Sequence, residues 1–91
     1  MYVIFDAKAK MYNKPFYMFN DQLAKRAFQD LRNDLNTDIG KHPEDFILFN
    51  IGEYDDENAT VITHDVPMVM CKAHELPFQP LEIPTENKEA E

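Results

Sequence analysis

The run of residues 46–54, FILFNIGEY, places the tightest limit on how this chain folds. β-Branched and aromatic residues dominate it, which is typical of a β-strand. Its apolar residues fall on both alternating faces of that strand rather than on one. A strand at the centre of a sheet is therefore predicted.

Four shorter runs are predicted to supply the other strands: residues 2–5, 16–19, 60–64 and 68–71. Pro15 precedes the second of these, and proline is acceptable where a strand begins. The acidic segment 55–58 predicts a turn, which makes a hairpin with a loop of about five residues. Residues 7–14 have no clear period and are predicted to form a loop.

One amphipathic helix is predicted, with Asn20 or Asp21 as its N-cap. Apolar residues recur at three- and four-residue spacing along one face of this helix. They are Leu23, Ala24, Ala27, Phe28, Leu31 and Leu35. Residues 36–40 are expected to end the helix, and Pro43 prevents its resumption. The pattern predicts an α+β fold: a small, mostly antiparallel sheet of four or five strands with one helix on one face.

The chain divides by composition into residues 1–75, a single domain, and residues 76–91, an extended acidic tail. Prolines at 77, 80 and 84 punctuate this tail, which ends in TENKEAE. Such a composition buries too little apolar surface to form a core.

A chain of 91 residues buries a modest core, so extra support is expected. The single cysteine, Cys71, excludes an intramolecular disulfide. Self-association is the remaining support, and a homo-oligomer is predicted. The sequence has no apolar run of membrane-spanning length and no signal-peptide pattern, so a cytoplasmic protein without membrane contact is expected.

Several kinds of catalytic site are excluded or disfavoured. The chain has no serine and only two glycines, which excludes a serine nucleophile and a phosphate-binding glycine loop. Cys71 and His74 have the spacing of a ligand pair, but a zinc site needs two more ligands. Cys71 lies in an apolar run, and burial raises a thiol's pKa and makes it a poor nucleophile. No enzymatic activity and no cofactor are expected.

The acidic turn at Asp55, Asp56 and Glu57 is a weak calcium candidate. It lacks the alternating ligands and the central glycine of a calcium loop. A solvated hairpin turn is the preferred interpretation.

Charge is unevenly distributed along the chain, whose net charge is −8. Residues 1–41 hold seven basic against five acidic residues, whereas residues 42–91 hold two against twelve. In the first part, cations alternate with aromatic residues, an arrangement that binds single-stranded nucleic acid through phosphates and stacked bases. The candidate residues for such binding are Lys8, Lys10, Tyr12, Lys14, Lys25 and Arg32. The alternative is that the rings belong to the core and the cations only provide solubility.

Three segments carry a resemblance to a known family. They are VIFDAKA at residues 3–9 with Pro15-Phe16, KHPEDF at 41–46 and LFNIGEYD at 48–55. Together they resemble the small nonstructural protein of gokushoviruses, which are single-stranded DNA phages of the Microviridae. The resemblance covers residues 2–74.

The resemblance implies a nonenzymatic phage accessory protein in the host bacterial cytoplasm. Such a protein would regulate the switch to viral single-stranded DNA synthesis and genome packaging, by binding single-stranded DNA or the phage replication complex. A structural or scaffolding protein that contacts capsid proteins without touching DNA is the alternative. No catalytic residue is carried over from the family.

Overall fold

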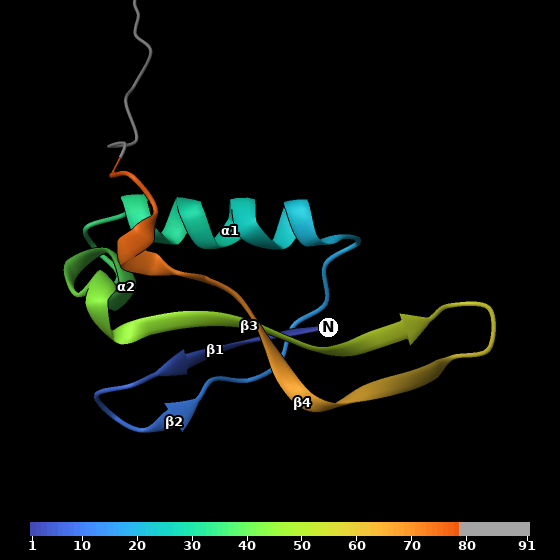
Figure 1. The fold of residues 1–91 in the computed structure, drawn as a ribbon. Helices are drawn as coiled ribbons and strands as arrows, with labels where there is room; N and C mark the ends of the chain where they lie inside the picture. Colours follow the sequence, from blue (N-terminus) through green and yellow to red (C-terminus); the bar gives the residue numbers. More distant parts are fainter. Residues whose placement is uncertain (79–91) are drawn as a thin grey trace, which may run out of the picture.

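A four-stranded antiparallel sheet with one long helix over one of its faces makes up the fold (Figure 1). The computed structural model describes residues 1–78. Its elements are β1 (Tyr2–Asp6), β2 (Met11–Tyr12), α1 (Asp21–Asn33), α2 (Asp38–Lys41), η1 (Pro43–Asp45), β3 (Phe46–Asp55), β4 (Thr60–Lys72) and η2 (Ala73–Glu75). The strand order is β2-β1-β3-β4. The predicted α+β class is confirmed, with four strands and one main helix.

Strand β3 lies between β1 and β4, which confirms the central position predicted from its sequence. Residues 46–50 of β3 pair with β1, and β4 pairs along residues 47–55 with two irregularities. Ile4 of β1 stands beside Leu48, and both side chains belong to the core under the helix. Val3 stands beside Phe49, and these two side chains point to the opposite face because strand residues alternate.

The core forms where α1 packs on the sheet. Its two largest fully buried side chains are Phe28 of α1 and Leu48 of β3, which are 1% and 0% exposed. Ala24, on the same helix face as Phe28, is also fully buried and brings the helix close to the sheet. Burying a side chain such as Leu or Phe contributes roughly 1.5–3 kcal/mol, so this contact is a principal stabilising element of the domain.

Helix α1 begins as the sequence predicts and ends earlier. Asn20 is the N-cap, and its side-chain oxygen accepts a 2.9 Å hydrogen bond from the Leu23 amide. The helix ends at Asn33, so Leu35 lies beyond it and is 58% exposed, not on the buried face as predicted. The Thr37 side chain then caps the short helix α2, within the segment that was expected only to end the first helix.

Two predictions for the first part of the chain are wrong. Residues 16–19 form no strand, and only Phe16 makes a single bridge to Tyr2. Residues 7–14, expected to be a loop, contain a turn and the short strand β2, where Tyr12 pairs with Phe5. The turn depends on Asp6, whose Oδ1 accepts hydrogen bonds from the Lys8 and Ala9 amides at 3.0 and 3.1 Å.

Residues 60–64 and 68–71, predicted as separate strands, form one strand, β4, that runs through Pro67. Its pairing with β3 is irregular between Asn50 and Gly52 and between Leu48 and Phe49. A proline is tolerated there because β4 is an edge strand and proline occurs at edges and bulges.

Strands β3 and β4 continue beyond the first residue of β1 as a two-stranded arm that ends in the acidic turn (Figure 1). Within this turn Asp55 accepts hydrogen bonds from the Glu57 amide and the Asn58 side chain, at 3.0 and 2.9 Å. The Asn58 bond, followed by the Glu57 bond, lowers the pKa of Asp55. This carboxylate therefore stabilises a hairpin turn, in agreement with the preferred interpretation of the segment.

The contacts of the domain extend past residue 75. Leu76 packs against the core, and the Pro77 carbonyl accepts a 3.0 Å hydrogen bond from Gln29 of α1. The Arg32 guanidinium carbon lies 5.2 Å from the centre of the Phe78 ring. The rest of the predicted tail, residues 79–91, lies outside the described residues.

Candidate functional site

Four of the six residues predicted to bind nucleic acid lie at one edge of the sheet. Lys8 and Lys10 are in the turn between β1 and β2, Tyr12 is in β2, and Lys14 lies two residues after it. All four are exposed. Lys10 has a φ of 57°, a left-handed conformation that bends the chain tightly at this turn. The fold therefore gathers these residues along the β2 edge. Lys8 there lines a hollow with Asp38 and Asp45, and Lys14 lines one under α1, so both lie toward the helix side.

The other two predicted residues, Lys25 and Arg32, lie on α1 and are not part of this group. Burial raises the pKa of the Cys71 thiol in β4, and the charge of Lys25 partly opposes that rise, so Lys25 lies near the β4 edge. Arg32 lies against Phe78. The predicted six-residue surface is thus divided between the β2 edge and the helix layer.

Three aromatic side chains form a continuous patch on the sheet face opposite α1. The ring centres of Phe5 and Tyr12 are 4.7 Å apart, and Phe49 is 6.5 Å from Phe5 and 6.0 Å from Tyr12. These separations are within the range of favourable aromatic pairs. Tyr12 is 53% exposed, whereas Phe5 and Phe49 are half-buried.

The face that carries this patch has no helix over it among residues 1–78 (Figure 1). We call it the open face. Val69 of β4 pairs with Phe49 and is 58% exposed on this face. Lys72 pairs with Ile47 and adds a cation there, because paired residues in adjacent strands share a face. The open face therefore combines aromatic rings with one lysine of β4, and the lysines of the β1–β2 turn lie at its edge.

Sequence reasoning missed Phe5 and Phe49 as part of this surface, because it placed both in predicted strands without assigning either to an exposed face. The signal was present in their spacing. Phe5 is one residue from Ile4, and Phe49 is one residue from Leu48, so each must face away from a buried neighbour. Recognising an open face, however, requires knowing that the chain has one helix layer to cover the sheet.

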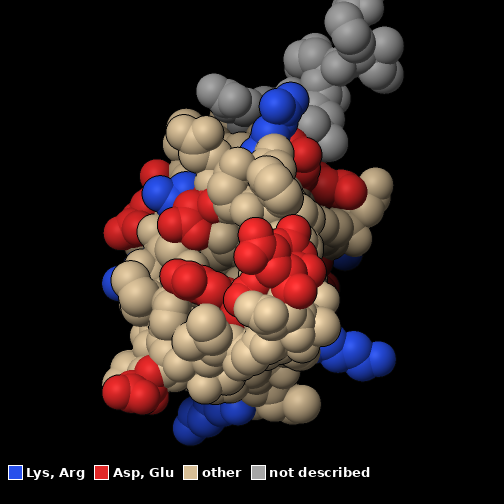
Figure 2. Space-filling view, turned by 90° about the vertical axis from the view of Figure 1, so that its right-hand side faces the viewer, with Lys and Arg blue, Asp and Glu red and all other residues tan. Residues whose placement is uncertain are grey.

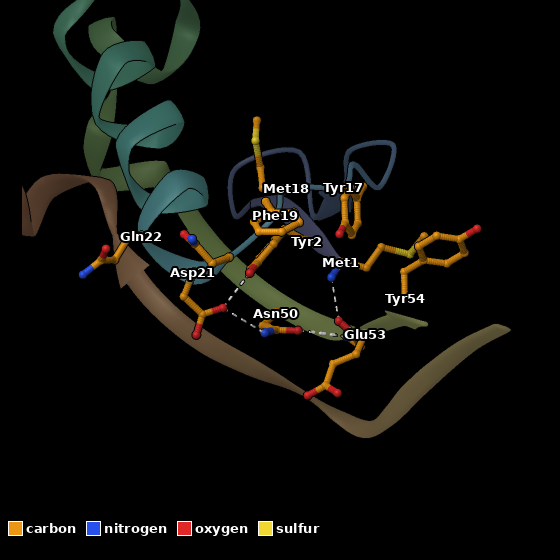
Figure 3. Close-up of a pocket in the computed structure, with 12 residues that line it drawn as sticks. Met1, Tyr2, Tyr17, Met18, Phe19, Asp21, Gln22, Asn50, Glu53 and Tyr54 are labelled. Atoms are coloured by element: carbon orange, nitrogen blue, oxygen red, sulfur yellow. Dashed lines mark hydrogen bonds between the residues drawn. The ribbon is translucent and has the colours of Figure 1, made fainter. Parts of the chain in front are cut away.

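A cavity of about 560 Å³ lies at the other end of the sheet, between the start of α1 and the β3–β4 arm (Figure 3). Asp21 Oδ1 accepts a 2.5 Å hydrogen bond from Tyr2 and a 3.4 Å bond from the Asn50 side chain. Burial, followed by the bond to Asp21, raises the pKa of Tyr2 to about 12. Glu53 and Tyr54 of β3 line the same cavity. None of the residues predicted to bind DNA lies there.

The described residues contain no group of three or more His, Cys, Asp or Glu side chains placed to hold a metal ion. Cys71 is half-buried and packs against the core. No helix within residues 1–78 is long and apolar enough to cross a membrane.

The fold and its surfaces define a small α+β domain with an aromatic open sheet face and a separate acidic cavity. The chain belongs to the phage ORF5 protein family, whose model matches residues 1–76. It is therefore a bacteriophage protein. Comparison with curated proteins gave no match, and comparison with solved structures gave none either.

Proposed function

We propose that this chain is a gokushovirus accessory protein that regulates the switch to viral single-stranded DNA synthesis and genome packaging. In this proposal it acts without catalysis in the cytoplasm of the infected bacterium, and it binds single-stranded DNA on the open face. The observation that carries the DNA-binding part is the patch of Phe5, Tyr12 and Phe49, with Lys72 on the same face of the sheet and the β1–β2 turn lysines at its edge.

The chemistry of single-stranded DNA fits such a surface. Unpaired bases stack on exposed rings, and lysines beside the rings neutralise phosphates. Tyr12 is the most exposed ring of the patch and is the expected first stacking position. Four-stranded antiparallel sheets with exposed aromatic residues bind single strands in this way in other modules.

The net charge of −8 limits the affinity. Four acidic residues, Glu53, Asp55, Asp56 and Glu57, lie on the β3–β4 arm, away from the β1–β2 turn. A strand that crosses the open face near β2 thus avoids the arm. Asp6, Asp38 and Asp45 line a hollow with Lys8 beside that turn. With about three phosphate contacts, the logarithm of the binding constant should fall with the logarithm of salt concentration at a slope near −2.

Fluorescence anisotropy with a labelled oligonucleotide at low salt tests the proposal. Tyr12→Ala should cost about 1–3 kcal/mol of binding free energy if a base stacks there. The double variant Lys8→Glu, Lys10→Glu should lower both the affinity and the salt slope. Its matched control is Lys25→Glu, Arg26→Glu, which changes the net charge equally but on exposed positions of α1.

No binding by the unaltered protein at about 100 micromolar would refute direct DNA contact, given that non-specific binding is usually tighter. Equal losses in the turn variant and the α1 control would show that net charge alone governs binding. Either result would favour the alternative of a scaffolding protein that contacts capsid proteins. The long edge strand β4, with Val66 70% exposed and Met68 55% exposed, is the observation that favours that alternative.

A further inference from the structure

The cavity beside the β3–β4 arm is lined by three of the chain's four tyrosines, Tyr2, Tyr17 and Tyr54. The Tyr17 and Tyr54 rings meet edge to face, with centres 5.8 Å apart and planes at 78° (Figure 3). Phe19 lines the cavity too and is 77% exposed. A cavity of about 560 Å³ falls within the size range of ligand sites, and four of the residues that line this one are aromatic.

Two carboxylates line the same cavity. Asp21 is held by Tyr2 and Asn50 through one oxygen, Oδ1, which fixes its position at the first turn of α1. The Glu53 side chain is exposed and makes no hydrogen bond or ion pair with any residue the structure describes. No lysine or arginine side chain lines this cavity within residues 1–78. The cation that lines the wall within residues 1–78 is the Met1 ammonium, which donates a 2.6 Å hydrogen bond to the Gly52 carbonyl oxygen and attracts Asp21 and Glu53. Two carboxylates therefore face one cation there.

The surface around the cavity has the same sign. Figure 2 looks onto the end of the molecule that carries the β3–β4 turn, and acidic side chains gather at its centre while basic ones lie at its margin. Asp56 and Glu57 in that turn are fully on the surface. Phosphate groups would be repelled here, so this end is unsuited to nucleic acid.

We propose that this cavity binds an arginine side chain presented by a basic segment of a protein partner. A guanidinium stacks on tyrosine faces through cation–π attraction and donates paired hydrogen bonds to a carboxylate. The walls supply both elements: rings at Tyr17 and Tyr54, and carboxylates at Asp21 and Glu53. This site is distinct from the open face, and it does not depend on whether that face binds DNA.

Intrinsic tyrosine fluorescence can report on the cavity alone. The Tyr12→Phe variant retains only tyrosines that line the cavity. Full-length protein with this change is titrated, at physiological ionic strength, with a short capped peptide that alternates arginine with glycine. Two comparison peptides replace arginine with lysine or with glutamine. Saturable change with the arginine peptide, weaker binding of the lysine peptide and none of the glutamine peptide are expected.

Paired variants locate the binding. Glu53→Gln and Tyr54→Leu, each made in the Tyr12→Phe protein, should each weaken the arginine peptide about fivefold, as the loss of one ion pair or cation–π contact implies. The matched control is Glu57→Gln, which removes the same charge from the turn outside the cavity wall. It should change the affinity less than about twofold, because Glu57 is exposed and salt screens its attraction to a guanidinium bound in the cavity. Circular dichroism confirms that each variant is folded.

Three results would overturn the proposal. One is the absence of saturable binding by the arginine peptide. Another is an equal effect of Glu53→Gln and Glu57→Gln, which would reduce the interaction to the general acidity of this end. The third is binding of the glutamine peptide as tight as that of the arginine peptide, which would show that neither an ion pair nor a cation–π contact is involved. DNA binding is measured separately, with the Lys8 and Lys10 variants. The arginine-binding proposal can therefore fail while the DNA-binding proposal stands, and the reverse.

Discussion

Tyr2 and Asp21 join the first strand of the sheet to the first turn of α1, through a 2.5 Å hydrogen bond from Tyr2 Oη to Asp21 Oδ1. Tyr2 is also 3% exposed, so its phenol is protonated in a site that disfavours a negative charge. The bond holds the helix N-terminus against the start of β1 and shapes one wall of the acidic cavity. Because of this buried phenol, the free energy of unfolding should fall at alkaline pH.

The pH dependence follows from the pKa of Tyr2, which rises from 10.0 to about 12 on folding. A raised pKa means that the folded state retains a proton that the unfolded state loses. The stabilising contribution is therefore complete below pH 10 and is lost as the pH rises toward 12. Denaturant unfolding of the unaltered protein should show this fall, and Tyr2→Phe should lack it. An unchanged pH profile in Tyr2→Phe would contradict the assignment to this residue.

The contrast between Leu48 and Leu35 tests where the core ends. Leu48→Ala should reduce the free energy of unfolding by about 2–5 kcal/mol, because Leu48 is 0% exposed. Leu35→Ala should change it by less than about 0.5 kcal/mol, because Leu35 is 58% exposed beyond α1. Denaturant unfolding gives both values. Should Leu48→Ala not fold, Leu48→Met is expected to fold with a loss below about 1.5 kcal/mol. Equal losses for the two alanine variants would contradict the structure.

The β3–β4 arm offers two substitutions with opposite expected signs. A Cβ at Gly52 would lie 2.5 Å from the Ile62 carbonyl oxygen and 3.0 Å from Thr63 Cα, so Gly52→Ala forces two backbones apart. Its expected cost is roughly 1–3 kcal/mol. Ala59 has a φ of 57°, so Ala59→Gly should stabilise the turn by up to about 1 kcal/mol. Thermal melts should show a lower and a higher midpoint respectively. A higher midpoint for Gly52→Ala would be inconsistent with the close approach of the strands.

Self-association remains a prediction, and the structure suggests β4 as the surface. Its outer edge has no neighbouring strand among residues 1–78, and Val66 and Met68 are 70% and 55% exposed. Unpaired strand edges pair readily with a second copy. Light scattering over a dilution series should show a dimer that Val66→Lys weakens. Leu35→Lys, at an exposed position outside the sheet, is the matched control, and a monomer mass at every concentration would refute the prediction.

Local sequence patterns were sufficient to predict β3 and α1, the elements with the clearest hydrophobic pattern and capping residue. The apolar run of β3 predicted a central strand, and Asn20 with the spacing of Ala24, Phe28 and Leu31 predicted the start and the buried face of α1. Strand period, helix period and capping are local properties, which is why they could be read without the fold. Lys8, Lys10, Tyr12 and Lys14 were close in sequence, and they remain close in space.

Tertiary structure decided the weaker strands and the composition of the surfaces, because both depend on which segments of the chain meet. β2 is two residues long and exists because β1 is available to pair with it, whereas residues 16–19 have strand-forming side chains but pair only at Phe16. The same pairing of distant segments moves Lys25 and Arg32 away from the turn lysines and brings Phe49 beside Phe5 and Tyr12. It also brings Glu53 and Tyr54 to Asp21 to form the cavity. The sequence by itself therefore determined most of the helices and strands. Contacts between distant residues decided the surfaces. The reason is that side-chain alternation divides a strand's residues into two sets, but which set is covered depends on the neighbouring strands and the helix layer.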